Sequence, residues 1–108
     1  MKEVSLQALS FRAIEIRNLY NERNQREIGK PWATEDLMLG FVVDVGDLAR
    51  TVMAQEGLRE MKNADATLRH ELADCLWSLL VIADEYRIPL HEIFPEQMDR
   101  LEKKILET

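Results

Sequence analysis

Apolar residues recur along most of this chain at intervals of three and four, the spacing that places side chains on one face of an α-helix. No segment shows the alternation of apolar and polar residues that is typical of a strand. The pattern predicts helices over residues 3–22, 34–56 and 95–107, and a further one that ends near Arg87. The short links between them favour an all-α antiparallel four-helix bundle.

Glycine, proline and capping residues mark the expected ends of the first two helices. Residues 23–33 are polar and contain Gly29 and Pro31, so we expect a loop there. Thr34 is a good N-cap for the second helix. Gly57 is expected to end that helix, because glycine readily adopts the left-handed conformation that follows a helix C-terminus.

The second half of the chain carries similar signals. Asn63 or Asp65 is expected to cap the third helix, and the Ile88–Pro89 step is expected to end it. A short turn over residues 90–94 then leads to Pro95, which suits the first turn of the last helix. The centre of the third helix, LADCLWSLLVIA, is apolar nearly all round, which indicates a central position or a subunit interface.

Length, charge and cysteine content exclude some classes of function. A chain of 108 residues is expected to form one domain, spanning residues 1–108. Its net charge of −6 repels phosphates, which argues against a polymer of DNA or RNA as partner. The single cysteine, Cys75, excludes an intrachain disulfide, and no apolar run approaches the roughly 20 residues of a membrane helix. We therefore expect a cytoplasmic protein without a membrane partner.

Two pairs of carboxylates interrupt the most apolar helices. Asp44 and Asp47 lie three residues apart, as do Glu71 and Asp74, so each pair shares a helix face. Like charges at this spacing raise each other's pKa unless a cation neutralises them, and only Asp47 has one in range, Arg50. If the two helices pack antiparallel, the pairs converge on an all-oxygen site that suits Mg²⁺ or Mn²⁺. The alternative is that these acids simply face water.

At these residues the chain resembles the MazG-like all-α nucleotide pyrophosphohydrolases, which include the dCTP pyrophosphatases. The family signature is EExxE, a spacer and then ExxD. Here the first element is VDVGDLA, residues 43–49, and the second is ELAD, residues 71–74. The segments KPWATEDLMLGF, residues 30–41, and MDRLEKKI, residues 98–105, are also similar to the family. The resemblance therefore covers nearly the whole chain, in order.

The resemblance implies hydrolysis of a nucleoside triphosphate to the monophosphate and pyrophosphate, with Mg²⁺, in the house-cleaning of nucleotide pools. It implies a homodimer or homotetramer. The metal ligands would be Asp44, Asp47, Glu71 and Asp74, of which Asp47 or Glu71 would also orient the attacking water. Val43 stands where the family has its first Glu. That departure favours an alternative function, a non-catalytic helical dimer that binds a nucleotide or a metal as a regulatory protein.

A nucleotide also needs a stacking surface and cations. Trp32, in the loop before the second helix, and Trp77, three residues after Asp74, are candidates to stack on the base. A core position is the alternative for Trp77, and a solvated basic face is the alternative for the cations. The candidate phosphate-binding residues are Lys30, Lys62, Arg100, Lys103 and Lys104.

Other nucleotide and metal motifs are absent. Neither the GxxxxGK[ST] loop nor the GxGxxG turn occurs in the chain. His70, Glu71 and Asp74 resemble part of the HExxH zinc motif, but no second histidine lies nearby, and zinc prefers nitrogen and sulfur ligands. The carboxylate pairs remain the main candidate site.

Overall fold

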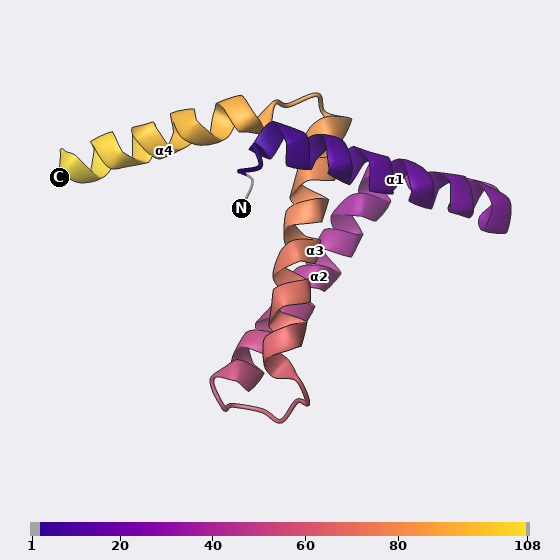
Figure 1. Ribbon diagram of the computed structural model, residues 1–108, viewed down its shortest axis with the longest axis horizontal. Helices are drawn as coiled ribbons and strands as arrows, with labels where there is room; N and C mark the ends of the chain where they lie inside the picture. Colours follow the sequence, from indigo (N-terminus) through magenta and orange to yellow (C-terminus); the bar gives the residue numbers. More distant parts are fainter. Residues whose placement is uncertain (1–2, 108) are drawn as a thin grey trace.

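The computed structural model describes residues 3–107, which contain helices and no strand (Figure 1). The expectation of an all-α chain with four helices is confirmed. None of these helices has both the length and the apolar character needed to cross a membrane. In chain order, the helices are α1, Leu6–Ile28; α2, Thr34–Gln55; α3, Ala64–Glu85; and α4, Leu90–Leu106.

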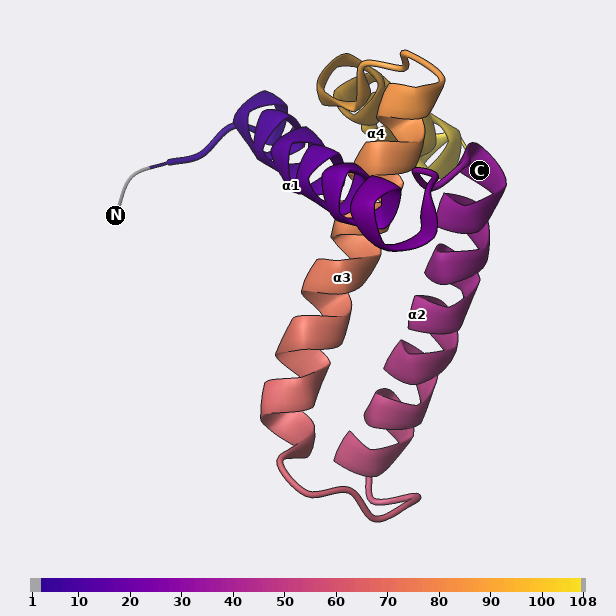
Figure 2. The ribbon, with the colours of Figure 1, turned by 90° about the vertical axis from the view of Figure 1, so that its right-hand side faces the viewer.

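The helices form an open arrangement. Figure 2 shows α2 and α3 side by side as an antiparallel hairpin. Helix α1 crosses the end of the hairpin at which α2 begins and α3 ends, and α4 runs away from it (Figure 1). The Cα radius of gyration is 16.8 Å, whereas about 13 Å is typical of a compact domain of this length. A single copy therefore leaves much of its surface uncovered.

The apolar core lies where α1 crosses the hairpin. It consists of the buried side chains Ala13, Leu37, Leu80 and Val81, and the partly buried Trp32 and Trp77 pack against it. The contributing residues come from α1, α2 and α3. This core therefore fixes the crossing of α1 over the hairpin.

The expected loop over residues 23–33 is wrong for residues 23–28, which continue α1. Nothing in RNQREI breaks a helix, so the chain stays helical until Gly29. Gly29 adopts the left-handed conformation, with φ of 78°, and its N–H donates to the Gln25 carbonyl at 3.2 Å. At the other end, the Ser5 hydroxyl accepts a hydrogen bond from the Ala8 N–H at 3.1 Å and caps α1.

The expected cap of α2 is also displaced by one residue. Ala33, not Thr34, is the N-cap residue, and its N–H donates to the Asp36 carboxylate at 2.8 Å. The Asp36 side chain thus satisfies a backbone donor at the helix start. Gly57 follows the end of α2 with φ of 80°, as expected from its sequence position.

The expected start of α4 is wrong, because the helix begins at Leu90 rather than at Pro95. Pro89 is the N-cap residue, and its carbonyl accepts hydrogen bonds from Glu92 and Ile93. Pro95 then lies within the helix. At that position a proline removes the backbone hydrogen bond to the carbonyl of residue 91, and its ring crowds that carbonyl. Asn63, by contrast, does precede α3 as one of the two expected caps.

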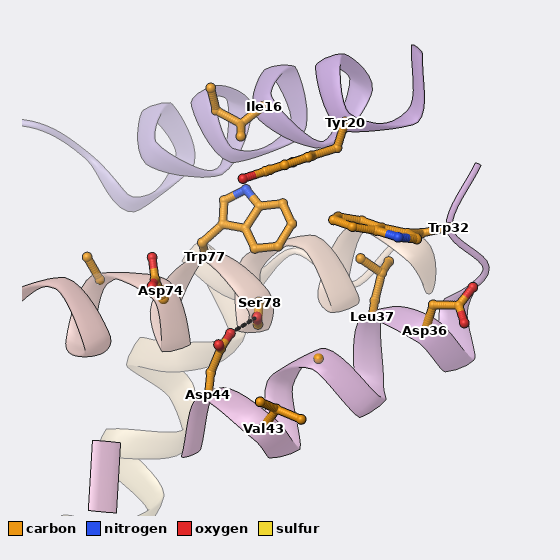
Figure 3. Close-up of a pocket in the computed structure, with 12 residues that line it drawn as sticks. Ile16, Tyr20, Trp32, Asp36, Leu37, Val43, Asp44, Asp74, Trp77 and Ser78 are labelled. Atoms are coloured by element: carbon orange, nitrogen blue, oxygen red, sulfur yellow. Dashed lines mark hydrogen bonds between the residues drawn. The ribbon is translucent and has the colours of Figure 1, made fainter. Parts of the chain in front are cut away.

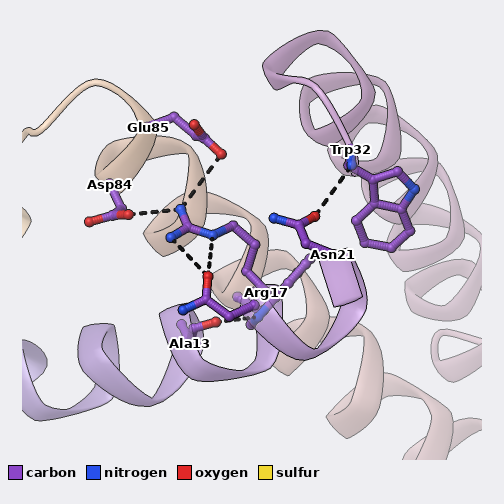
Figure 4. Close-up of polar contacts among 8 residues, drawn as sticks. Ala13, Arg17, Asn21, Trp32, Asp84 and Glu85 are labelled. Atoms are coloured by element: carbon purple, nitrogen blue, oxygen red, sulfur yellow. Dashed lines mark hydrogen bonds and ion pairs between the residues drawn. The ribbon is translucent and has the colours of Figure 1, made fainter. Parts of the chain in front are cut away.

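Arg17 ties α1 to the C-terminal end of α3 (Figure 4). Its guanidinium, with the side chain 14% exposed, lies 2.7 Å from Asp84 and 3.6 Å from Glu85. Because α3 has no basic residue of its own in its last turn, Arg17 supplies the positive charge that the helix end favours.

Replacing Arg17 with alanine is expected to lower the free energy of unfolding by about 2 kcal/mol, since a hydrogen bond to a charged group is lost. Chemical denaturation measures this change. Arg12→Ala is the matched control, because Arg12 and Glu15 form a pair at 3.9 Å that is largely exposed. Equal losses in the two variants would contradict the assigned role of Arg17.

Candidate metal centre and adjoining pocket

Carboxylates from α2 and α3 meet on the hairpin. Asp44 and Asp47 on α2 and Glu71 on α3 each offer an oxygen, and these oxygens lie within 4.8 Å of one another. All three residues are half-buried. The convergence follows from the antiparallel hairpin, since the i,i+3 spacing puts Asp44 and Asp47 on the helix face that α3 approaches. These three residues have the spacing and the all-oxygen donors of a divalent metal site.

Asp74, the fourth expected ligand, is not part of this three-carboxylate group. It is exposed and lines a pocket beside the group. Its charge nevertheless acts on the cluster, because it raises the pKa of both Asp44 and Glu71. The structure thus places Asp74 at the pocket wall next to the centre.

Burial and mutual repulsion shape the electrostatics of the centre. Burial raises the pKa of Asp44, the charges of Asp74 and Asp47 raise it further, and the Ser78 hydrogen bond opposes them. That bond runs from the Ser78 hydroxyl to Asp44 Oδ2 at 3.4 Å. Burial likewise raises the pKa of Glu71, followed by the charges of the three aspartates. In the folded chain, burial and the neighbouring charges therefore disfavour the ionised forms of Asp44 and Glu71, and a nearby cation would favour them.

Arg50 is the cation that the sequence placed in range of Asp47, and the structure confirms the contact. Its guanidinium forms an ion pair with the Asp47 carboxylate. The Arg50 charge also lowers the pKa of Glu71, against the larger effects that raise it. Arg50 therefore neutralises the centre only in part.

A cavity of about 620 Å³ lies between α1, α2 and α3, directly beside the carboxylates (Figure 3). Aromatic rings from Tyr20, Trp32 and Trp77 line one part, and the carboxylates of Asp44 and Asp74 line another. Asp44 therefore belongs both to the metal candidate and to the pocket. A third carboxylate, that of Asp36, lines the cavity near Trp32, so acidic groups lie at both ends of the aromatic part (Figure 3).

The aromatic rings are held in place. The ring centroids of Tyr20 and Trp32 lie 4.9 Å apart, and those of Tyr20 and Trp77 lie 5.8 Å apart. Trp77 Nε1 donates to the Ala13 carbonyl at 3.1 Å. The Trp32 backbone N–H donates to Asn21 Oδ1 at 3.3 Å (Figure 4). Trp77 thus packs against the core, as the alternative for this residue had it, and it also lines the pocket, while its stacking on a base stays a prediction.

Tyr20 is one of the pocket residues that sequence reasoning missed, as are Asp36 and Ser78. It fits the apolar pattern of α1, and its spacing carries no signal that separates a pocket wall from a core position. Only the crossing of α1 over the hairpin brings Tyr20 to Trp32 and Trp77. Val43, the departure from the family motif, also lines the cavity.

None of the expected phosphate-binding cations lines this cavity in the described chain. Lys30 is exposed before α2, and Lys62 lies in the turn at the far end of the hairpin. Arg100 donates to Gln97 at 3.2 Å, and Lys103 lies 4.0 Å from Glu107. These two residues and Lys104 lie on α4, which runs away from the hairpin. The cavity is therefore acidic and aromatic, without a basic side chain of its own among the residues described.

Comparisons with known proteins return no relative. No family model matches the chain, no curated protein matches it, and no solved structure matches it. The resemblance to MazG-like enzymes rests on the sequence motifs alone, and the candidate site rests on the geometry described above.

Proposed function

We propose that this protein hydrolyses a nucleoside or deoxynucleoside triphosphate to the monophosphate and pyrophosphate, as a house-cleaning enzyme of nucleotide pools. The observation that carries the proposal is a shared residue. Asp44 belongs to the three-carboxylate group and also lines the aromatic cavity. A metal-bound triphosphate and a stacked base would therefore lie next to each other.

The residues fit Mg²⁺, and Mn²⁺ as an alternative. Asp44, Asp47 and Glu71 offer only oxygen donors, which hard cations prefer. Burial raises the pKa of Asp44 and of Glu71, and the charges of neighbouring carboxylates, which a divalent cation would offset, raise it further. Asp74, the fourth expected ligand, lines the pocket and lies outside the three-carboxylate group.

In this mechanism the chain positions a water molecule against the phosphate next to the sugar. Glu71 accepts a hydrogen bond from that water and takes its proton, since Asp47 is already paired with Arg50. The water oxygen bonds to the α-phosphorus, the bond from that phosphorus to the bridging oxygen breaks, and pyrophosphate leaves. A bound Mg²⁺ would neutralise phosphate charge and lower the pKa of coordinated water. No covalent intermediate is needed.

Product analysis tests the proposal. The protein is incubated with each nucleoside and deoxynucleoside triphosphate and Mg²⁺, and the products are separated by ion-exchange chromatography. Monophosphate and pyrophosphate in equal amounts are expected for at least one substrate. Release of inorganic phosphate alone would contradict the proposed bond cleavage.

The alternative function is a non-catalytic regulatory dimer that binds a nucleotide or a metal. Val43 favours it, because this apolar side chain lines the cavity where the family motif has a carboxylate. This alternative predicts that nucleotide or Mg²⁺ raises the melting temperature without any turnover. The same product assay, run beside a thermal melt, separates the two functions.

Trp32 is expected to contribute to nucleotide binding by stacking on the base. Trp32→Ala should raise KM by about tenfold or more, since stacking on an aromatic side chain contributes about 1–3 kcal/mol per base. Trp32→Phe should recover most of this loss. Steady-state kinetics measure the effect, with Tyr86→Ala as control, because Tyr86 is an exposed aromatic outside the cavity. An unchanged KM in Trp32→Ala would place the base elsewhere.

A further inference from the structure

The polar side chains of the cavity between α1, α2 and α3 are mostly anionic. Outside the aromatic rings they are those of Asp36, Asp44, Asp74 and Ser78. The Ser78 hydroxyl already donates to Asp44 at 3.4 Å. None of the three aspartates forms an ion pair with another residue in the described part of the chain. A ligand that fits this cavity therefore supplies the cations and the hydrogen-bond donors itself.

The carboxylates lie at two separate places along the cavity. Figure 3 shows Asp36 at one end, beside Trp32, and Asp44 and Asp74 at the other end, near Trp77. Aromatic rings and aliphatic side chains line the stretch between these ends. The matching ligand therefore carries a positive charge at each end and an apolar segment in the middle.

The aromatic rings suit such a ligand as well. The face of a tryptophan or tyrosine ring carries partial negative charge and attracts ammonium and guanidinium groups. Tyr20 already shows this attraction, because the Arg23 guanidinium carbon lies 5.2 Å from its ring centroid. Arg23 does not line the cavity, and it also lies 3.8 Å from Glu27. The rings that do line the cavity can thus contact both the charged ends and the apolar middle of a ligand.

Size and shape separate the candidate ligands. The volume of about 620 Å³ lies within the range of roughly 300–1,000 Å³ that is typical of small-molecule sites. An inorganic cation would contact the carboxylates of one end and leave the aromatic stretch without a partner. A quaternary ammonium ion has one charge for two acidic ends. A linear aliphatic diamine satisfies both ends, because its ammonium groups, with a pKa near the value of about 10.4 for lysine, stay charged at neutral pH.

We propose that this cavity binds a linear aliphatic diamine or polyamine, with one ammonium group at Asp36, another at Asp44 and Asp74, and the methylene chain against the rings of Trp32 and Trp77. The inference goes beyond the proposed function and stands without it, since it needs neither a metal nor a nucleotide. Because the diamine and a nucleotide base would fill the same space, binding of one would exclude the other.

Calorimetric titration of the full chain with a series of α,ω-diamines of increasing length tests the proposal. The buffer is free of amines and contains EDTA and about 0.15 M salt, which screens the general attraction of cations to an acidic protein. The best diamine is expected to bind at least about tenfold more tightly than the monoamine of the same chain length, because its second ammonium adds a hydrogen bond between charged groups. A series in which no diamine binds more tightly than its monoamine would overturn the proposal.

Tryptophan fluorescence locates the ligand. The chain has two tryptophans, and both line the cavity. A diamine in the cavity is therefore expected to change the tryptophan emission with the dissociation constant that calorimetry gives. Heat of binding without any change in emission would place the diamine elsewhere on the acidic surface and would also overturn the proposal.

Asp36→Asn tests the end beside Trp32. Asparagine keeps an oxygen that can accept from the Ala33 N–H, as Asp36 does at 2.8 Å, but it lacks the charge. The diamine affinity is expected to fall at least about tenfold, to that of the monoamine. Glu35→Gln is the matched control, because Glu35 is the exposed neighbour on the same helix turn and does not line the cavity. Equal losses in the two variants would show attraction to the net charge alone and would contradict the assigned site.

Asp74→Asn tests the other end and guards against loss of the fold in Asp36→Asn. Asp74 is exposed and caps no helix, so this variant is expected to keep the wild-type melting temperature. Its diamine affinity should fall at least threefold, a smaller loss than in Asp36→Asn because Asp44 remains at that end. A folded Asp74→Asn protein with the wild-type affinity would overturn the assignment of the second ammonium group.

Discussion

Glu71→Gln is expected to lower turnover of the nucleotide by about 10²–10⁴-fold, the range that a positioned general base contributes. Glutamine keeps the size of the side chain and one oxygen donor, but it cannot take the proton of the attacking water. It also removes a negative charge from the group of carboxylates that would hold the proposed metal. The loss should therefore appear in kcat as well as in the Mg²⁺ concentration that gives half-maximal rate.

Release of pyrophosphate, followed in a coupled assay over a range of Mg²⁺ concentrations, measures both effects. Glu102→Gln is the control, because Glu102 is an exposed residue of α4, outside the cavity and the three-carboxylate group. Its kcat should equal that of the wild type. A Glu71→Gln protein with wild-type kcat would remove Glu71 from the chemistry and, with it, the proposed mechanism.

The meeting of Asp44, Asp47 and Glu71 was predictable from the sequence because each step is local. Intervals of three residues fix a shared helix face, and a short connection that contains Gly57 forces the two helices to pack antiparallel. Asp74 shows the limit of this reasoning. A shared face spans a wide arc, and the side chain that lies at its edge lines the cavity rather than joining the three-carboxylate group.

The direction of α4 was not predictable from local pattern. The Ile88–Pro89 step indicates a helix break, but the exit direction depends on the backbone of the turn, where Arg87 adopts a left-handed conformation with φ of 56°. The Ile88 N–H donates to the Ala83 carbonyl at 2.9 Å across this turn. Because of that turn, α4 runs away from the hairpin and carries Arg100, Lys103 and Lys104 with it. The sequence had suggested that these residues bind the phosphates of a nucleotide.

The predicted ends of the helices were wrong where hydrogen bonds in the folded chain outweigh the intrinsic capping preference of a residue. Thr34 is a better N-cap than Ala33 by propensity, yet the Asp36 carboxylate that accepts from the Ala33 N–H moves the start by one residue. Tyr20 is a pocket residue for a different reason, since tertiary contact with Trp32 and Trp77 decides its role. Such contacts are invisible in a single periodic helix.

Without divalent metal, Asp44→Asn is expected to be more stable than the wild type at neutral pH. The ordinary pKa of an aspartate is 3.8, and the folded chain raises that of Asp44, chiefly through burial and then through the Asp74 charge. The folded state therefore holds this proton more tightly than the unfolded chain. Its contribution to stability is fully present below pH 3.8 and is lost as pH rises through the raised pKa. Asparagine avoids this loss and still accepts the Ser78 hydrogen bond.

Thermal melts in EDTA between pH 3.5 and 7.5 measure the difference between variant and wild type, which cancels titrations elsewhere in the chain. The difference should grow as pH rises from about 4, the region in which an unfolded aspartate ionises. Asp99→Asn, on exposed α4, should show no such trend. Mg²⁺ should reverse the order at neutral pH, because it stabilises the wild type by binding the ionised carboxylate and gains less from a neutral amide. The prediction is contradicted if the wild type is more stable than Asp44→Asn in EDTA at pH 7. That result would mean that burial and the neighbouring charges do not disfavour the ionised form of Asp44. The strongest physical reason for a metal in the hairpin would then be lost.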